Sequence, residues 1–287
     1  MKHQATIYDF VIYGILLFAC TVTLIPIMHV VSVSFSGPIA VAKATIMLYP
    51  QEFSLNAYHY IFGNQALIRS LGITVFITVA GTLLNLIFTV SMAYPLSKRG
   101  LLGAKLLMLM VIFIMTFSAG IIPQFLNVKN FGLINSVWAM ILPGLINTFY
   151  LVLMRSFMME LPEEIEESAR MDGCNEVSVL LRIIVPLSLP AMATLGLFYA
   201  VGHWNEFFKG LFYINDSAKW PLQVLLKTIV FDNDMSDLYS ADNLDLVVLP
   251  ENVQSAAIVF SMAPIALLYP FLQKYFIRGL VLGAVKG

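Results

Sequence analysis

The chain has 287 residues, of which 59% are hydrophobic and only 11% are charged. Soluble domains carry about 25% charged residues, so this composition excludes an ordinary soluble domain and indicates a protein that crosses a membrane repeatedly. A net charge of −1, with no run of basic residues, argues against nucleic-acid binding.

Six apolar segments along the chain are each long enough to cross about 30 Å of hydrocarbon as a helix. They cover residues 10–33, 71–96, 106–126, 133–153, 183–208 and 255–276. The first is longer than the apolar core of about 7–15 residues in a cleaved signal peptide, so we expect it to be retained. The sequence therefore predicts an all-α, polytopic membrane protein with six transmembrane helices.

The spans divide the chain into three predicted parts. Residues 1–67 form an N-terminal span and an extracellular loop, residues 68–277 form a transmembrane domain with five spans, and residues 278–287 form a cytoplasmic tail. The orientation follows from Lys and Arg, which are enriched in cytoplasmic loops. With both termini in the cytoplasm, ten of the 16 basic residues lie inside, in shorter loops, and six lie outside.

One polar stretch, residues 161–190, interrupts the apolar segments on the predicted cytoplasmic side. Seven of the 17 acidic residues lie between positions 160 and 176. Pro162 suits the first turn of a helix, Gly173 can adopt the left-handed conformation that ends one, and Asn175 can cap the next. An apolar stripe at helical spacing follows, formed by Val177, Leu180, Leu181 and Ile184. These features predict two short helices, bent at Gly173, that run into the fifth span.

The sequence contains no pattern typical of catalysis or metal binding. It lacks a G-x-x-x-x-G-K-[ST] phosphate loop and an H-E-x-x-H motif, and Cys20 and Cys174 lie in different surroundings. We therefore expect no enzyme activity, cofactor or metal site in this chain, and any energy for its work comes from another subunit. Glu206 and Lys209, three residues apart near the end of the fifth span, either mark the membrane interface or line a transport path.

The polar stretch carries a spaced motif that resembles a known signature. The motif consists of Glu167-Ser168-Ala169, then Gly173, then, after nine residues, Ile183-Ile184-Val185-Pro186. It is similar to the E-A-A, G, I-x-L-P pattern of permease subunits of bacterial ABC importers. Asp172 before the glycine is typical of the sugar-importer branch. Ser168 replaces the middle alanine and Val185 replaces the leucine, and both changes roughly keep size and character.

The resemblance covers nearly the whole chain, which looks like the smaller permease of the maltose-type oligosaccharide importers. Further motifs that carry it are Tyr49-Pro50, Asn56-Ala57-Tyr58, Trp204-Asn205-Glu206-Phe207-Phe208, Lys219-Trp220-Pro221-Leu222 and residues 283–287. It implies a type I ABC importer permease fold and oligosaccharide import by alternating access in the bacterial plasma (inner) membrane. The implied partners are a homologous second permease, a cytoplasmic ATPase dimer that uses ATP and Mg, an extracellular substrate-binding protein, the sugar and membrane lipid.

The same resemblance assigns roles within the polar stretch. Residues 162–182 would be the coupling helices that contact the ATPase, with Glu167 in a charged contact and Gly173 allowing the bend. Ser168 and Ala169 would permit close packing. The residues assigned to ATPase coupling are Glu167, Ser168, Ala169, Asp172, Gly173, Ile183 and Pro186.

A carbohydrate path favours aromatic faces and neutral hydrogen-bonding groups. The candidates are Asn85, Asn147, Tyr199, Trp204 and Asn205. For each of them a helix–helix hydrogen bond or an interfacial anchor is the alternative interpretation. Residues 216–253, a long polar loop, either contact the binding protein or are an ordinary solvated loop. Two other functions stay open: a permease of the same signature for an amino acid or an anion, which the nearly uncharged spans disfavour, and a membrane scaffold or sensor.

Overall fold

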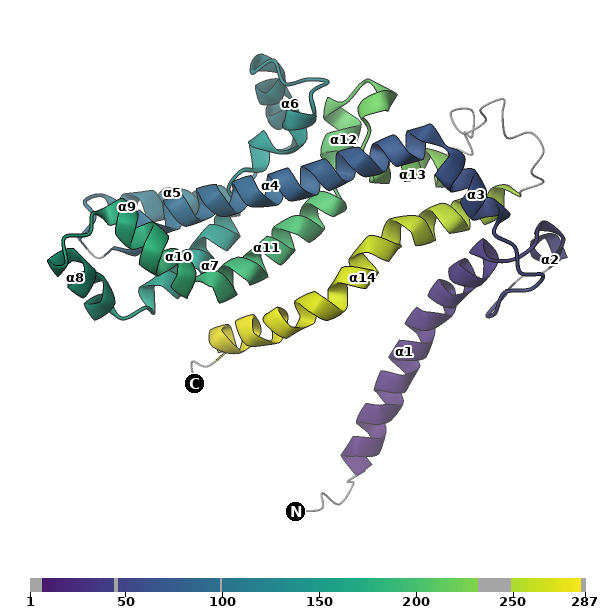
Figure 1. Cartoon of the computed structure of the whole chain (residues 1–287), viewed down its shortest axis with the longest axis horizontal. Coiled ribbons are helices and arrows are strands. Elements are labelled where there is room, and N and C mark those ends of the chain that lie inside the picture. The colour runs from purple at the N-terminus through teal and green to yellow at the C-terminus, as the bar shows by residue number, and fades with distance from the viewer. Residues whose placement is uncertain (1–6, 44–45, 99, 232–248, 285–287) are drawn as a thin grey trace. The chain divides into compact units, whose positions relative to one another are not determined.

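The computed structural model describes residues 7–43, 46–98, 100–231 and 249–284, and no strand occurs among them. The predicted all-α class is therefore confirmed for this part of the chain. The α-helices, labelled as in Figure 1, are α1 (Ile7–Ser34), α2 (Pro38–Lys43), α3 (Asn56–Gly63), α4 (Gln65–Ser97), α5 (Ala104–Thr116), α6 (Ile121–Asn130), α7 (Thr148–Met159), α8 (Glu163–Met171), α9 (Glu176–Val179), α10 (Val185–Leu187), α11 (Leu189–Trp204), α12 (Phe208–Tyr213), α13 (Leu222–Phe231) and α14 (Pro250–Ala284). Short 3₁₀ helices lie at Val137–Met140 (η1), Leu142–Gly144 (η2) and Ser217–Lys219 (η4), and Leu180–Ile184 (η3) is π-helical.

The predicted spans are only partly continuous helices. Two helices among the described residues are long and apolar enough to cross a membrane unbroken, Phe10–Ser34 and Gln65–Ser97. Three helix pairs reach that length only across a bend: α5 with α6 (116°), η1–η2 with α7 (48°), and α9–α10 with α11 (78°). The sixth predicted span, residues 255–276, lies inside α14.

The third predicted span, residues 106–126, is not one helix as the sequence suggests. α5 ends at Thr116, and Gly120 then adopts a φ of 79° before α6 begins. Phe117, directly after α5, is already extended, and glycine readily reaches the positive φ that Gly120 adopts before α6. Pro123 lies in the first turn of α6, where its missing N–H costs no hydrogen bond. The residues on both sides of this sharp turn are apolar, so composition alone does not reveal the turn.

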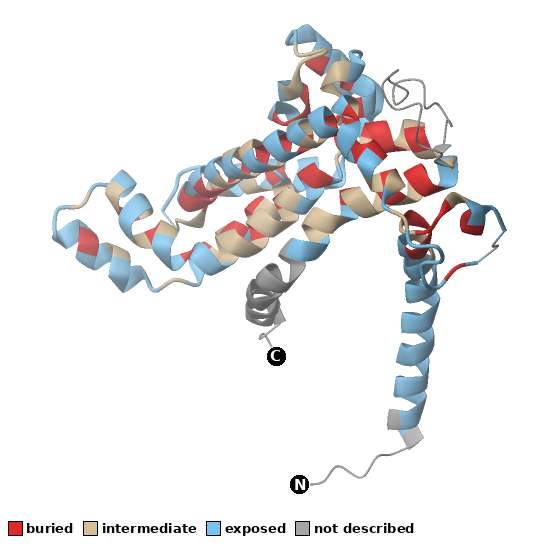
Figure 2. Cartoon of the chain, turned by 45° about the vertical axis from the view of Figure 1, so that its right-hand side comes forward, coloured by how far each residue is buried: buried red, intermediate tan, exposed pale blue. Residues whose placement is uncertain are grey.

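The chain forms two compact units. One consists of Met1–Ile68 with Leu225–Pro264, and the other of Arg69–Val224 with Ile265–Gly287. In the first unit, the most apolar part of α1 has no buried residue (Figure 2). The side chain of Asn252 in α14 donates to the carbonyls of Val33 and Ser36, at 2.9 and 3.0 Å, and so holds the end of α1. The division into three parts at positions 67/68 and 277/278 stays a prediction.

The second unit contains the packed core that supports the polar stretch. Residues of α4, α7 and α11 supply its buried side chains, and α8–α10 lie at the end of α4 (Figures 1 and 2). The largest contribution comes from α4 and α7: Val90, Ala93, Tyr94, Leu96, Leu151, Met154 and Met158. The loop predicted at residues 216–253 is partly helical, since it contains η4 and α13, and its residues 232–248 lie outside the described part of the chain.

Candidate functional site

α8 and α9 form the bent pair that the sequence predicts in the polar stretch. Gly173, between them, has a φ of 85°. Its N–H donates to the carbonyl of Arg170 and the next N–H donates to the carbonyl of Ala169, both at 3.0 Å, which is the bonding pattern of a Schellman motif. The side chain of Asn175 accepts a hydrogen bond from the N–H of Ser178 at 2.8 Å and caps α9. The predicted bend and cap are both confirmed.

The connection from α9 to α11 is less regular than predicted. It passes through the π-helical turn η3 and bends by 78° at Ser188. A π-helical turn closes over five residues instead of four and therefore shifts which side chains share a face. The predicted apolar stripe is accordingly wrong: Val177 and Leu181 are 63% and 60% exposed, whereas Val179 and Ile184 are buried.

The inward face of the bent pair packs on the core of the second unit. Ala169 of α8, Val179 of α9 and Ile184 are buried in the same cluster as Leu96 of α4 and Met154 of α7. The burial of Ala169 in this apolar cluster fits a small side chain at its position. Ser168 is exposed and takes no part in this packing.

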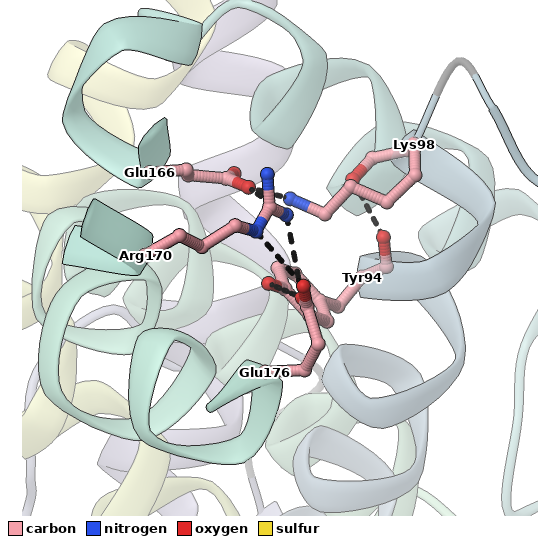
Figure 3. A network of polar contacts seen from close by, with 6 residues as sticks. Tyr94, Lys98, Glu166, Arg170 and Glu176 are labelled. Atoms are coloured by element: carbon pink, nitrogen blue, oxygen red, sulfur yellow. Dashed lines mark hydrogen bonds and ion pairs between the residues drawn. The ribbon is translucent and has the colours of Figure 1, made fainter. Parts of the chain in front are cut away.

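Five polar side chains gather where this face meets the end of α4, and Figure 3 shows them pointing toward one another. We call Tyr94, Lys98, Glu166, Arg170 and Glu176 the polar cluster. Lys98, directly after α4, forms an ion pair with Glu166 of α8, and its ammonium group lies 4.0 Å from the centre of the Tyr94 ring. The Tyr94 hydroxyl donates to Glu176 Oε2 at 2.8 Å. The end of α4 therefore contacts both α8 and α9.

Arg170 connects α8 to α9 within the polar cluster. Its Nε donates to Glu176 Oε1 at 2.9 Å, and its Nη2 lies 3.4 Å from Glu166 Oε2. The hydrogen bond from Arg170, followed by the one from Tyr94, lowers the pKa of the Glu176 carboxyl below its ordinary value. The same contact with Glu176 raises the pKa of Arg170. Both shifts favour the charged forms of Arg170 and Glu176. Arg170 thus braces the bend at Gly173 from one side.

The opposite face of the bent pair is exposed, and it mixes acidic with apolar side chains. We call it the exposed face, and it consists of Glu164, Glu167, Met171, Asp172, Val177 and Leu181. Met171 is 87% exposed beside the bend. Within the described part of the chain, the carboxylates of Glu167 and Asp172 make no ion pair or hydrogen bond. The sequence assigns Glu167 and Asp172 of this face to coupling but not Glu164 or Met171. An apolar residue in a polar stretch is the signal that could have identified Met171.

The other residues assigned to coupling lie further along the chain. Ile183 is partly buried against the core of the second unit, and Pro186 is exposed in α10. Both precede the bend at Ser188. The coupling roles of all seven assigned residues stay predictions.

Three of the five substrate-path candidates meet in hydrogen bonds between helices. Asn85 of α4, 2% exposed, donates to the carbonyl of Gly144 at 2.9 Å and lies 3.2 Å from Nε2 of the buried His203 of α11. The hydroxyl of Tyr199 lies 2.8 Å from Thr89 Oγ1 and accepts from the N–H of Asn147 at 3.1 Å; the Asn147 side chain in turn caps α7.

The remaining two candidates lie near the end of α11. Trp204 is buried, whereas Asn205 is exposed and donates to the carbonyl of Val201 at 2.9 Å. In this chain the side chains of Asn85 and Tyr199 are therefore used between helices and the side chain of Asn147 caps α7, and a substrate-path role stays a prediction for all five. His203, which lies within hydrogen-bond distance of Asn85 from 118 positions away, is not among the five candidates.

Glu206 and Lys209 form the ion pair that their spacing suggests. Lys209 Nζ lies 2.7 Å from Glu206 Oε2 and also donates to the carbonyl of Met140 at 3.2 Å. The two residues do not share one helix, because α11 ends at Trp204 and α12 begins at Phe208. The pair instead ties this junction to the segment η1.

A sequence model of one family matches most of the chain. The family is described as "Binding-protein-dependent transport system inner membrane component", and the match covers residues 85–281. This range contains the bent pair, the polar cluster and all five substrate-path candidates.

Individual relatives match over almost their whole length. The protein LplC of Bacillus subtilis (strain 168) is 46% identical, with 93% of this chain and 90% of the relative covered. The "polygalacturonan/rhamnogalacturonan transport system permease protein YtcP" of the same organism is 44% identical over 100% of both chains. A chain in the crystal structure of "a bacterial ABC transporter involved in the import of the acidic polysaccharide alginate" superimposes with a TM-score of 0.89 at 33% identity, covering 96% of this chain and 100% of that one.

Proposed function

The chain belongs to the family of binding-protein-dependent transport system inner membrane components, and from this premise we propose that it carries oligosaccharides as the permease subunit of an ATP-driven importer. The ABC importer permease fold that the sequence predicts is confirmed by the match to the alginate transporter. The proposal of a sugar substrate rests on the same match and on YtcP, whose name gives polygalacturonan and rhamnogalacturonan as its substrates. The chain works as a membrane subunit without catalysis of its own.

The partners are proposed from the family, and we assign surfaces of the chain to them. We assign the exposed face of α8 and α9 to contact with a cytoplasmic ATPase that uses ATP and Mg. With six spans, both termini would then lie in the cytoplasm. The apolar surface of α1, which has no buried residue in its most apolar part, is suited to lipid or to a homologous second permease. An extracellular binding protein would deliver the sugar, with residues 216–253 as its contact.

The exposed face carries the coupling proposal. Its acidic groups, Glu167 and Asp172, are not neutralised within the described part of the chain, and Met171 projects beside them. An interface with an apolar centre and charges at its rim is the usual composition of a specific protein contact. Closure of the ATPase dimer would then move α8 and α9 together, and the permease pair would alternate between outward and inward openings.

Transport by the assembled complex tests the substrate class. Proteoliposomes containing this chain, its partner permease and the ATPase, with the binding protein added, are assayed for uptake of a neutral and an acidic oligosaccharide. An amino acid and an inorganic anion serve as comparison solutes. We expect ATP-dependent uptake of at least one oligosaccharide and of neither comparison solute. Uptake of a comparison solute alone contradicts the proposal.

Replacing Glu167 by lysine tests the coupling role of the exposed face. We expect uptake to fall by about tenfold or more. The lysine would face a basic group of the ATPase, and two like charges opposed in an interface cost several kcal/mol. Membrane insertion should be unchanged, since the Glu167 side chain is exposed. Glu160→Lys makes the same change of charge at an exposed position outside α8, and is expected to transport normally. Normal transport by Glu167→Lys with the wild-type ATPase removes Glu167 from the contact.

A further inference from the structure

We infer that Lys98 and Glu166 are positioning residues that fasten α8 to the end of α4, so that movement of the bent pair passes directly into this membrane helix. The inference rests on the proposed function, because it takes an ATPase to be the source of the movement. It gives the polar cluster a role different from docking to the ATPase, which is to transmit movement of the bent pair to α4.

The first support is the connectivity of the polar cluster. Lys98 reaches Glu166 across 68 positions, and Tyr94 reaches Glu176 across 82 positions. Arg170 contacts both acidic residues and closes the ring. The end of α4 is therefore attached separately to α8 and to α9, and neither helix can shift along α4 without breaking one of these contacts.

The second support is the difference in exposure between the acidic residues of the loop. The Glu166 side chain is 13% exposed and the Lys98 side chain 25%, whereas Glu176 is 60% exposed. Exposed ion pairs contribute little, and sheltered ones depend strongly on both partners being present. Among the contacts of the cluster, loss of the Lys98–Glu166 pair should therefore weaken the attachment of α8 to α4 most. Lys98 also lies beyond the last residue of α4, where a helix favours positive charge.

The third support concerns the other route by which movement could travel. Along the chain, α9 leads to α11 only through the π-helical turn η3 and the 78° bend at Ser188. A π-helical turn and a sharp kink interrupt the regular hydrogen bonding along a helix. α4 is a single helix of 33 residues from Gln65 to Ser97. A push applied to α8 is thus carried over a greater length by α4 than by the connection to α11.

The test compares neutral variants of the two residues in the complete transporter. Lys98→Gln and Glu166→Gln each remove one charge of the pair, and Lys105→Gln removes a charge from an exposed lysine of α5 as a control. The readout is the number of ATP molecules hydrolysed per sugar imported. We expect this ratio to rise by about threefold or more in either variant and to stay unchanged in the control, with the double variant no worse than the single ones.

A covalent replacement of the ion pair separates transmission from folding. Cysteines are placed at positions 98 and 166 in a chain whose Cys20 and Cys174 are replaced by serine, and are joined by a cleavable thiol-reactive crosslinker of matching length. The joined protein should couple ATP hydrolysis to import as the wild type does, and reduction of the linker should raise the ratio again. If the glutamine variants were merely unstable, crosslinking would not restore the coupling of ATP hydrolysis to import, and reduction of the linker would not remove it again.

The same preparations distinguish failure of this inference from failure of the proposed function. A cysteine at the exposed Met171 reports contact with the ATPase by crosslinking to it. If that crosslink does not form in an otherwise unmodified complex, docking of the exposed face is wrong. If it forms, and both glutamine variants still hydrolyse ATP and import sugar in the wild-type ratio, the positioning role of Lys98 and Glu166 is overturned and docking stands.

Discussion

Replacing Gly173 by valine is expected to abolish transport while leaving the membrane helices in place. Gly173 has a φ of 85°, a conformation in which an L-residue loses about 1–2 kcal/mol and a β-branched residue is a strong outlier. No atom lies within 4 Å of a Cβ added there, so the cost comes from the backbone and not from a clash. A valine would therefore open the turn, separating Arg170 from Glu176 and releasing α9 from α8.

A matched substitution tests that the backbone is responsible. Asparagine tolerates the left-handed conformation better than other non-glycine residues, so Gly173→Asn should retain most of the transport that Gly173→Val loses. Uptake and copurification of the ATPase are measured for both variants, with the amount of chain in the membrane as the reference. Equal uptake by the valine variant and the wild type contradicts the role of the bend, and equal loss in both variants contradicts the backbone explanation.

The bend itself was predictable because its causes are local. A glycine in the left-handed conformation and an asparagine cap depend on a few neighbouring residues, and both Gly173 and Asn175 behave as the sequence indicates. The apolar stripe after them was not predictable in the same way. It assumed 3.6 residues per turn, whereas packing of Val179 and Ile184 into the core is achieved through a π-helical turn. Composition likewise gave the extent of the third and fifth spans without their bends.

The contacts between distant segments mark the limit of sequence reasoning. The acidic stretch indicates an unusual loop, but the neighbouring sequence does not distinguish the sheltered Glu166 from the exposed Glu167 beside it. That difference arises because α4 ends next to α8 and presents Lys98 there. In the same way the sequence suggests Asn85 for a sugar path but does not indicate its partners, His203 and the carbonyl of Gly144. A residue type can be read from the sequence, whereas its partner depends on the tertiary structure.

Replacing Gly81 by alanine is expected to destabilise the contact between α4 and α11. A Cβ at this position would lie 2.5 Å from Nε2 and 2.7 Å from Cε1 of His203. The ring cannot easily move away, because His203 is buried and lies within hydrogen-bond distance of Asn85. Small residues allow close approach of helices in membranes, and overpacking a filled contact costs about 1–3 kcal/mol. The temperature at which the purified complex loses its native fluorescence or its monodispersity should therefore fall.

The same helix supplies the control for this substitution. Gly72 also lies in α4, but nothing lies within 4 Å of a Cβ added there, so Gly72→Ala should not lower the transition temperature and gains from the better helix propensity of alanine. Removing the opposing ring tests the cause directly. In the Gly81→Ala background, His203→Ala should destabilise less than it does in the wild type, because the crowding that it relieves offsets the hydrogen bond that it removes. If the two substitutions simply add, Gly81 and His203 do not interact, and the close approach of α4 and α11 at this point does not contribute to the stability of the permease.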